Sequence, residues 1–109
     1  MSAPETSLQP AVFDAGPLIY LDSLDYAKLL PELHRVIAPP AVLRELAARP
    51  DEPGGRIPDC FRIECQTPGK ECLDRVGQKP PALDDGEEEA IALAFDRGFK
   101  RIMRRGKNR

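Results

Sequence analysis

The chain has 109 residues, of which 41% are hydrophobic and 31% are charged, the composition of one ordinary globular domain. No apolar run approaches the roughly 20 residues that a membrane-spanning helix needs, and the N-terminus lacks the basic and apolar regions of a secretory signal. We therefore expect no membrane association, a disordered lead-in over residues 1–10, one domain over residues 11–105 and a basic tail over residues 106–109.

The net charge is only −2, but the charged residues are segregated along the chain. Residues 84–89 carry five acids, and residues 97–109 carry seven bases. A basic segment of this kind attracts nucleic acid through the release of counterions, or it is a solvated tail on a nearly neutral protein.

The cysteines and the histidine limit the kinds of metal site and catalytic site that the chain can form. The three cysteines, Cys60, Cys65 and Cys72, form no CxxC pair, which argues against a disulfide framework and against a zinc site. His34 is the only histidine, so a histidine-based metal site or catalytic triad is nearly excluded. A reducing, cytoplasmic compartment fits this pattern best.

The first half of the chain alternates short apolar runs with helical patterns. Residues 11–13 predict a buried strand, and Pro17 is well placed as the first residue of a helix. A second short helical stretch is predicted over residues 26–33. Residues 36–38 predict another buried strand, and the two prolines that follow start a helix through Ala48.

The middle of the chain is dominated by loop signals. Residues 49–59 are rich in proline and glycine and predict a loop. Residues 61–65 alternate apolar and polar side chains, as a half-exposed strand does. Residues 66–82 predict a further loop with one turn of helix over residues 72–76.

The last part of the chain predicts a helix and a short strand. The helix covers residues 87–95, with Asp84 or Asp85 as its N-cap and Gly98 as its end. Residues 102–103 predict the strand. This alternation of buried strands and helices predicts an α/β fold with a mainly parallel sheet.

Acidic residues stand where apolar residues would be expected. Asp14 directly follows a buried strand, at the carboxyl end, where ligands bind in parallel α/β sheets. Glu45 shares a helix face with Ala41, Val42 and Ala48, at spacings of three and four residues.

Glu87 is the third such acid. It lies at the centre of the apolar stripe of its helix, on the same face as Ala90 and Ala94. The next two acids, Glu88 and Glu89, rotate away from this stripe, so we expect them to face solvent.

Each acid also has a purely structural explanation. Asp14 caps the following helix, Glu45 pairs with Arg44 or Arg49, and Glu87 is favoured by the helix dipole. A purely structural explanation for all three acids in one small domain requires three independent coincidences, which occur together less often than any one of them. Three converging carboxylates would repel one another unless a cation lay between them, and hard oxygen ligands suit Mg²⁺ or Mn²⁺.

Three segments resemble, in order and spacing, the sequence blocks of PIN domains. Residues 12–19 (VFDAGPLI) are similar to the family's opening, a hydrophobic strand that ends in aspartate before a short helix. Residues 36–46 (VIAPPAVLREL) resemble the second block, a strand and a proline-led helix with its glutamate. Residues 86–94 (GEEEAIALA) resemble the third, in which the acid after a glycine contributes to the metal site. The resemblance covers about residues 11–105.

The resemblance implies a three-layer α/β/α fold and the metal-dependent hydrolysis of RNA phosphodiester bonds. Asp14, Glu45 and Glu87 would then be the catalytic residues and the ligands of Mg²⁺ or Mn²⁺, which activates a water and stabilises charge on the phosphate. Many small members of the family are toxins of toxin–antitoxin pairs, so the resemblance implies RNA as substrate and an antitoxin protein as partner.

The chain departs from the family at its C-terminal end. PIN domains continue past the third helix into a strand that ends in one or two aspartates, whereas here Arg104 or Arg105 stands at that position and Arg109 is last. We therefore expect a fold that is incomplete at the C-terminus. A guanidinium beside the site would repel a cation by on the order of several kcal/mol at intermediate dielectric. Either this arginine folds back onto Asp14 and Glu87 and neutralises them, or the tail stays away from the site.

Three functions compete on these observations. The first is a metal-dependent endoribonuclease of toxin type, and the second is a catalytically inactive PIN-like remnant that binds nucleic acid or protein. The third is a small dimerising α/β protein without a ligand. Missing C-terminal elements would leave a sheet edge or a core face uncovered, so we expect a homodimer.

Overall fold

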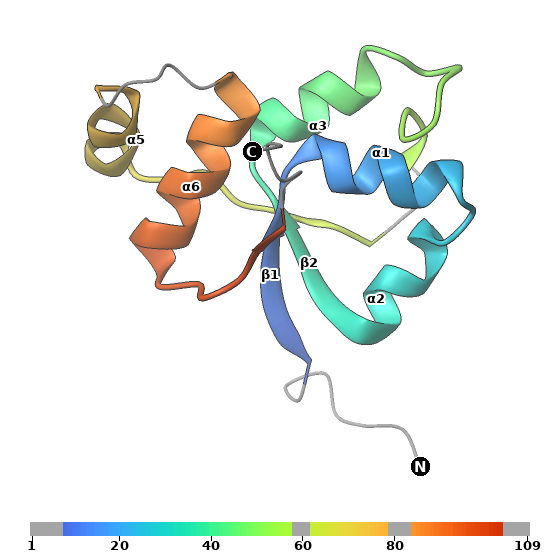
Figure 1. Ribbon diagram of the computed structural model, residues 1–109. Helices are drawn as coiled ribbons and strands as arrows, with labels where there is room; N and C mark the ends of the chain where they lie inside the picture. The colour runs from blue at the N-terminus through green and yellow to red at the C-terminus, as the bar shows by residue number, and fades with distance from the viewer. Residues whose placement is uncertain (1–7, 58–61, 79–83, 104–109) are drawn as a thin grey trace, which may run out of the picture.

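The computed structural model describes residues 8–57, 62–78 and 84–103 (Figure 1). In these residues, four parallel strands form one sheet in the order β3-β2-β1-β4. The strands are β1 (Gln9–Phe13), β2 (His34–Ala38), β3 (Glu64–Cys65) and β4 (Ile102–Met103). The helices are α1 (Ala15–Ser23), the 3₁₀ helix η2 (Ala27–Leu29), α2 (Leu30–Leu33), α3 (Pro40–Ala47), α5 (Lys70–Gly77) and α6 (Asp85–Arg97).

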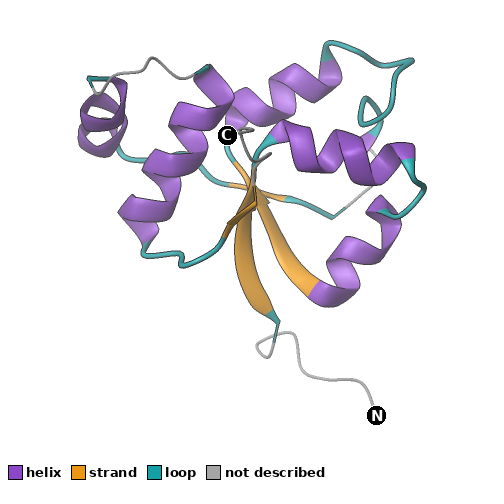
Figure 2. Cartoon of the chain, in the orientation of Figure 1, coloured by secondary structure: helices purple, strands orange, loops and turns teal. Residues whose placement is uncertain are grey.

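The sheet is the middle one of three layers. Helices α1, α2 and α3 lie on one side of it, and α5 and α6 lie on the other, as Figure 2 shows by the separation of the two helix groups. The predicted three-layer α/β/α fold with a mainly parallel sheet is therefore confirmed. None of the helices in the described ranges is long and apolar enough to cross a membrane.

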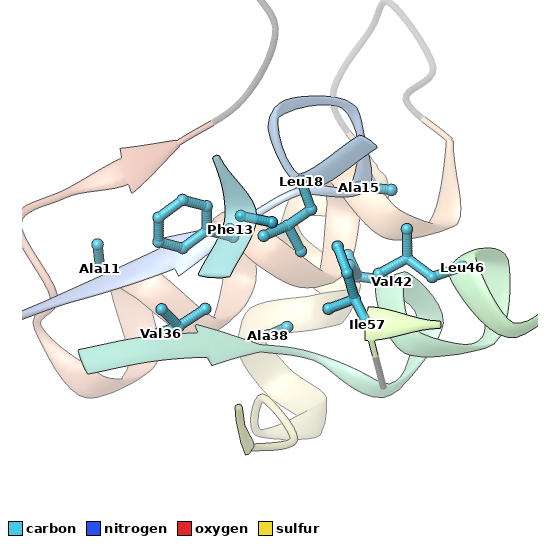
Figure 3. Close-up of a cluster of buried hydrophobic side chains, with 10 residues drawn as sticks. Ala11, Phe13, Ala15, Leu18, Val36, Ala38, Val42, Leu46 and Ile57 are labelled. Atoms are coloured by element: carbon cyan, nitrogen blue, oxygen red, sulfur yellow. The ribbon is translucent and has the colours of Figure 1, made fainter. Parts of the chain in front are cut away.

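One core lies between the sheet and helices α1, α2 and α3 (Figure 3). Because successive strand residues face opposite sides, every second residue of β1 and β2 points into this core. Removing this apolar surface from water stabilises the layer at about 25 cal/mol per Å². The buried members are Ala11, Phe13, Ala15, Leu18, Ala27, Val36, Ala38, Val42, Leu46 and Ile57.

A smaller core lies on the opposite face, between the sheet and α6. Val12 of β1 and Ile37 of β2 are fully buried there against Ala90, Leu93 and Ala94 of α6. The central strands are thus buried on both faces, which explains why their sequences read as continuous apolar runs rather than as an alternation.

The order of the strands indicates where a ligand would bind to the sheet. From β1 the chain proceeds through β2 to β3 on one side, and β4 then pairs with the other side of β1. The strand order therefore reverses at β1, and ligands of open parallel sheets bind at the carboxyl ends of the strands at such a point. The residue that follows β1 at this end is Asp14.

Several boundaries differ from the sequence predictions. Strand β1 begins at Gln9, so two residues of the expected lead-in belong to the sheet, and α1 begins at Ala15 rather than at Pro17. The strand predicted from residue 61 is reduced to Glu64–Cys65 in the described residues. The lead-in at residues 1–7 and the tail at 106–109 lie outside the described residues.

Helix α5 is the largest difference. The sequence predicts one turn over residues 72–76, whereas α5 spans eight residues, Lys70–Gly77. Its half-buried side chains Cys72, Leu73 and Val76 have helical spacing, and the helix packs against α6. This packing makes a full helix favourable in a segment where local signals indicate mostly loop.

Candidate active site

Asp14 lies at the point where the sheet passes into the first helix. Its backbone N–H donates to the carbonyl oxygen of Met103 at 2.8 Å, and its Oδ1 accepts from the N–H of Ala15 at 2.8 Å. The predicted structural role is therefore confirmed, because Asp14 is the N-cap of α1. The residue is only 9% exposed, which is unusual for a carboxylate and is consistent with a place in a site.

Glu87 lies in the first turn of α6 and is only 8% exposed, as its position on the apolar stripe predicts. Its backbone N–H donates to Asp84 Oδ1 at 2.8 Å, and its own Oε1 accepts from the Asp84 N–H at 3.5 Å. This reciprocal capping box identifies Asp84, rather than Asp85, as the N-cap. The positive end of the helix dipole also favours these acids.

Gly86 marks the point where acids from separate elements meet. A Cβ atom on Gly86 would lie 3.1 Å from Oδ1 of Asp14 and 3.4 Å from Oε1 of Glu45. Both carboxylate oxygens therefore lie within 3.4 Å of one point on the first turn of α6, beside the buried Glu87. The structure thus places carboxylate oxygens of Asp14 and Glu45 beside the first turn of α6, in which Glu87 lies.

Glu45 differs from the prediction in its burial. Its helix neighbours Ala41 and Val42 are buried, but Glu45 and Ala48 are exposed, so Glu45 lies at the margin of the buried face rather than on it. The reason is that α3 presents its buried stripe through Val42 and Leu46 to the core, and Glu45 is rotated away from the centre of this stripe.

The charges around Glu45 act on its protonation. Although the residue as a whole is exposed, burial of its carboxyl group is the first cause that raises its pKa, and the carboxylates of Asp84, Asp14 and Glu87 raise it further. The positive charge of Arg49 lowers the pKa and opposes these effects only in part. The negative charges of Asp84, Asp14 and Glu87 therefore act on the carboxyl group of Glu45.

The arginines that could have paired with Glu45 have other acidic partners. Arg44 lies 3.8 Å from Glu89, and Arg49 lies 3.1 Å from Glu52. The alternative in which Glu45 serves only as a helix-surface ion-pair partner is therefore not supported by these contacts.

The donor chemistry fits a hard divalent cation. The acids supply carboxylate oxygens, and their mutual repulsion would be relieved by a positive charge. Within residues 8–57, 62–78 and 84–103, no three His, Cys, Asp or Glu side chains are already arranged as a metal-binding group.

The sequence analysis misses two further acids that lie around the site. Asp84 is predicted only as a possible cap, and its charge acts on Glu45. Glu89 is predicted to face solvent, but its Oε1 accepts a hydrogen bond from the N–H of Ala41 at 3.0 Å. The capping-box spacing of Asp84 and Glu87 could have identified Asp84. No local sequence pattern indicates the contact of Glu89 with α3.

The sequence analysis leaves two alternatives for the basic tail, which either neutralises the site or stays away from it. Arg104 and Arg105 lie outside the described residues, so the two alternatives for the tail remain predictions.

Comparison with known proteins agrees with the geometry. A family model described as a PIN domain matches residues 10–105. No match was found among curated proteins or among solved structures. A PIN domain indicates a nuclease-type function, and PIN domains generally depend on divalent metal ions. With its parallel three-layer fold and a match over most of its length, the chain belongs to the PIN-domain family.

Proposed function

We propose that this protein is a metal-dependent endoribonuclease that hydrolyses RNA phosphodiester bonds, with Asp14, Glu45 and Glu87 holding Mg²⁺ or Mn²⁺. The observation that carries the proposal is the approach of Asp14 Oδ1 and Glu45 Oε1 to one point beside Gly86. Glu87 is the next residue along α6 and is buried at the same end of the sheet.

The three acids have different tasks in this proposal. The backbone hydrogen bonds of Asp14 and Glu87 fix the two buried carboxylates, which limits the reorganisation needed when a ligand binds. Glu45 is exposed and has more freedom to move toward a ligand from the solvent side. When bound, the metal supplies an activated water and positive charge opposite the phosphate. Without such a charge, the acid cluster would repel the RNA backbone.

We also propose the biological setting that the family resemblance implies, the toxin of a toxin–antitoxin pair in the cytoplasm. Cys65 and Cys72 are free thiols, which suits a reducing compartment. Large apolar side chains of α1, η2, α2 and their connections are exposed, and either an antitoxin or a second copy of the chain would cover such a surface. These side chains are Tyr20, Leu24, Tyr26, Leu29 and Leu33.

The test is a calorimetric titration with Mn²⁺ followed by an RNA cleavage assay, on the wild type and on Asp14→Asn. Asparagine is as good an N-cap as aspartate, so this variant should remain folded while the carboxylate is lost. Asp74→Asn is the matched control, because Asp74 is an exposed aspartate of α5. We expect metal binding and cleavage in the wild type and in the control, and neither in Asp14→Asn.

Two results would contradict the proposal. The first is a folded wild type that does not bind Mn²⁺, which would favour the inactive PIN-like remnant. The second is metal binding that survives unchanged in Asp14→Asn, since this would place the ion at a different site.

A further inference from the structure

The first turn of α3 depends on an acceptor from another helix. Pro39 occupies the N-cap and provides no side-chain cap, and Pro40 has no N–H to satisfy. The N–H groups of Val42 and Leu43 both donate to the carbonyl oxygen of Pro39, at 3.1 and 3.3 Å. The N–H of the buried Ala41 is therefore the group of this turn that needs an external acceptor.

Glu89 of α6 provides this acceptor. Its Oε1 lies 3.0 Å from the N–H of Ala41, and its Oε2 lies 3.8 Å from the guanidinium of Arg44. The Glu89 side chain is only 17% exposed, so water competes little for the contact. A carboxylate at this position also interacts favourably with the positive end of the α3 dipole.

The contact connects the two helices that carry two of the proposed ligands. Ala41 lies one turn before Glu45 on α3, and Glu89 lies two residues after Glu87 on α6. Helices α3 and α6 pack against each other beside the carboxyl ends of β1 and β2 (Figure 1). This hydrogen bond therefore joins the two turns that carry the proposed ligands.

We propose that Glu89 is a positioning residue, which holds α3 against α6 so that Glu45 and Glu87 face the same ion. This inference rests on the proposed function, because it assigns Glu89 a role in the geometry of that metal site. Glu89 does not itself bind the metal in this proposal. It acts through the backbone of α3.

The experiment compares Mn²⁺ affinity in Glu89→Ala, Glu89→Gln and Glu88→Ala by calorimetry, under conditions where circular dichroism shows all of them folded. Glutamine keeps an acceptor oxygen for Ala41 but loses the charge. Glu88 is the matched control, because its replacement removes the same charge from the neighbouring residue of α6 and its carboxylate lies toward Gly77 of α5. We expect Glu89→Ala to bind Mn²⁺ roughly tenfold more weakly, as supporting residues of metal sites typically do.

The other variants separate positioning from charge and from stability. We expect Glu89→Gln to be closer to the wild type than to Glu89→Ala, and Glu88→Ala to bind as the wild type does. A merely stabilising role would lower resistance to urea in Glu89→Ala but leave the Mn²⁺ affinity of the folded protein unchanged, and this result would overturn the inference. Equal losses in Glu89→Ala and Glu88→Ala would also overturn it, because they would indicate a general charge effect.

The wild type and Asp14→Asn, titrated beside these variants, test the proposed function separately. If the wild type binds and Asp14→Asn does not, the metal site stands, and the Glu89 variants alone decide the inference. If Glu89→Ala does not fold, Glu89→Asp is compared with Glu88→Asp instead, because aspartate keeps the charge but shortens the side chain that reaches the N–H of Ala41. A loss of affinity confined to Glu89→Asp then supports the inference, and equal affinities in these two variants overturn it.

Discussion

At the scale of single residues, the acids of the site combine a structural and a proposed chemical role. Asp14 caps α1 and Glu87 completes the capping box of α6, yet both carboxylates are almost fully buried at one end of the sheet. A cap on the protein surface needs no such burial. The two explanations that the sequence leaves open are therefore compatible, because the caps determine where the carboxylates are held.

Gly86 leads to the first prediction. We expect Gly86→Ala to weaken Mn²⁺ binding by about tenfold, because its Cβ would lie 3.1 Å from Asp14 Oδ1 and displace that carboxylate from its place. Alanine in a helix is otherwise favoured over glycine by up to about 1 kcal/mol. The measurement is a calorimetric titration beside urea unfolding.

Gly77→Ala provides the control for this prediction. A Cβ on Gly77 would lie 3.6 Å from the nearest atom of Glu88, which is an ordinary contact, so the affinity for Mn²⁺ should be unchanged. If Gly86→Ala binds metal as tightly as Gly77→Ala does, the acids do not converge on Gly86 as the geometry indicates.

The residues of the site could be predicted from the sequence to different extents. Asp14 and Glu87 interrupt strong apolar patterns, which makes their burial predictable. The sequence singles out Glu45 but does not predict its exposure. Two residues on the same helix face, Ala41 and Val42, are buried, whereas Glu45 lies at the margin of that face. The hydrogen bond from Ala41 to Glu89 could not be predicted, since it depends on how α6 is placed against α3.

At the scale of elements, helix ends and strand pairs determine local stability. Helix α6 ends at Gly98, which has a φ of 72° and no atom within 4 Å of a Cβ placed there. We expect Gly98→Ala to lower the free energy of unfolding by about 1 kcal/mol, because only the left-handed backbone conformation opposes the new side chain. Gly98→Asn should lose less, since asparagine tolerates this conformation better. Urea unfolding measures both, and equal stabilities of wild type and Gly98→Ala would contradict the prediction.

The pairing of β2 with β3 predicts a dependence on pH. Arg35 of β2 donates two hydrogen bonds to Glu64 of β3, at 2.8 and 3.0 Å. Hydrogen bonding to Arg35 is the first cause that lowers the pKa of Glu64, and burial opposes it. Because the folded pKa is depressed, the pair contributes its full stability above the unfolded value of 4.5, and this contribution is lost as the pH falls through the lower folded pKa.

We therefore expect Arg35→Met to be less stable than the wild type at pH 7, by less than about 1 kcal/mol because both side chains are about 40% exposed. The difference between the two proteins should shrink as the pH falls below 4.5. Urea unfolding from about pH 3 to about pH 7 tests this, with Arg56→Met as a control at another exposed arginine. A difference that does not change with pH would mean that packing, rather than the ion pair, stabilises the strands.

Elements were predictable where local patterns and tertiary packing agree. The strands β1 and β2 and the helices α3 and α6 have strong apolar patterns and clear end signals, and they form close to where they are predicted. Helix α5 was underestimated because its few apolar side chains gain their partners only when α6 is present. Strand β3 is short because only Glu64 and Cys65 pair with β2.

At the scale of the whole molecule, the three layers leave one apolar surface on the side of α1 and α2. Helix α1 is apolar on nearly all sides, so the core covers Leu18 while Tyr20 remains 62% exposed. On the opposite side of the sheet, Phe95 of α6 is a separate exposed aromatic. The sequence predicts a homodimer from an uncovered sheet edge or core face, and we propose that the contact instead uses this exposed apolar surface.

The last prediction concerns this surface. We expect the wild type to behave in light scattering as a particle of twice the 12.1 kDa of one chain, and Leu33→Lys to behave as a single chain. Leu33 of α2 is 64% exposed, so lysine should cost little in the monomer but should place a charge in an apolar contact. Phe95→Lys is the matched control, because Phe95 is 76% exposed but belongs to α6, across the sheet. A monomeric wild type would contradict the homodimer, and dissociation by Phe95→Lys alone would place the contact on the α6 side, because a charge disrupts only the surface in which it is buried.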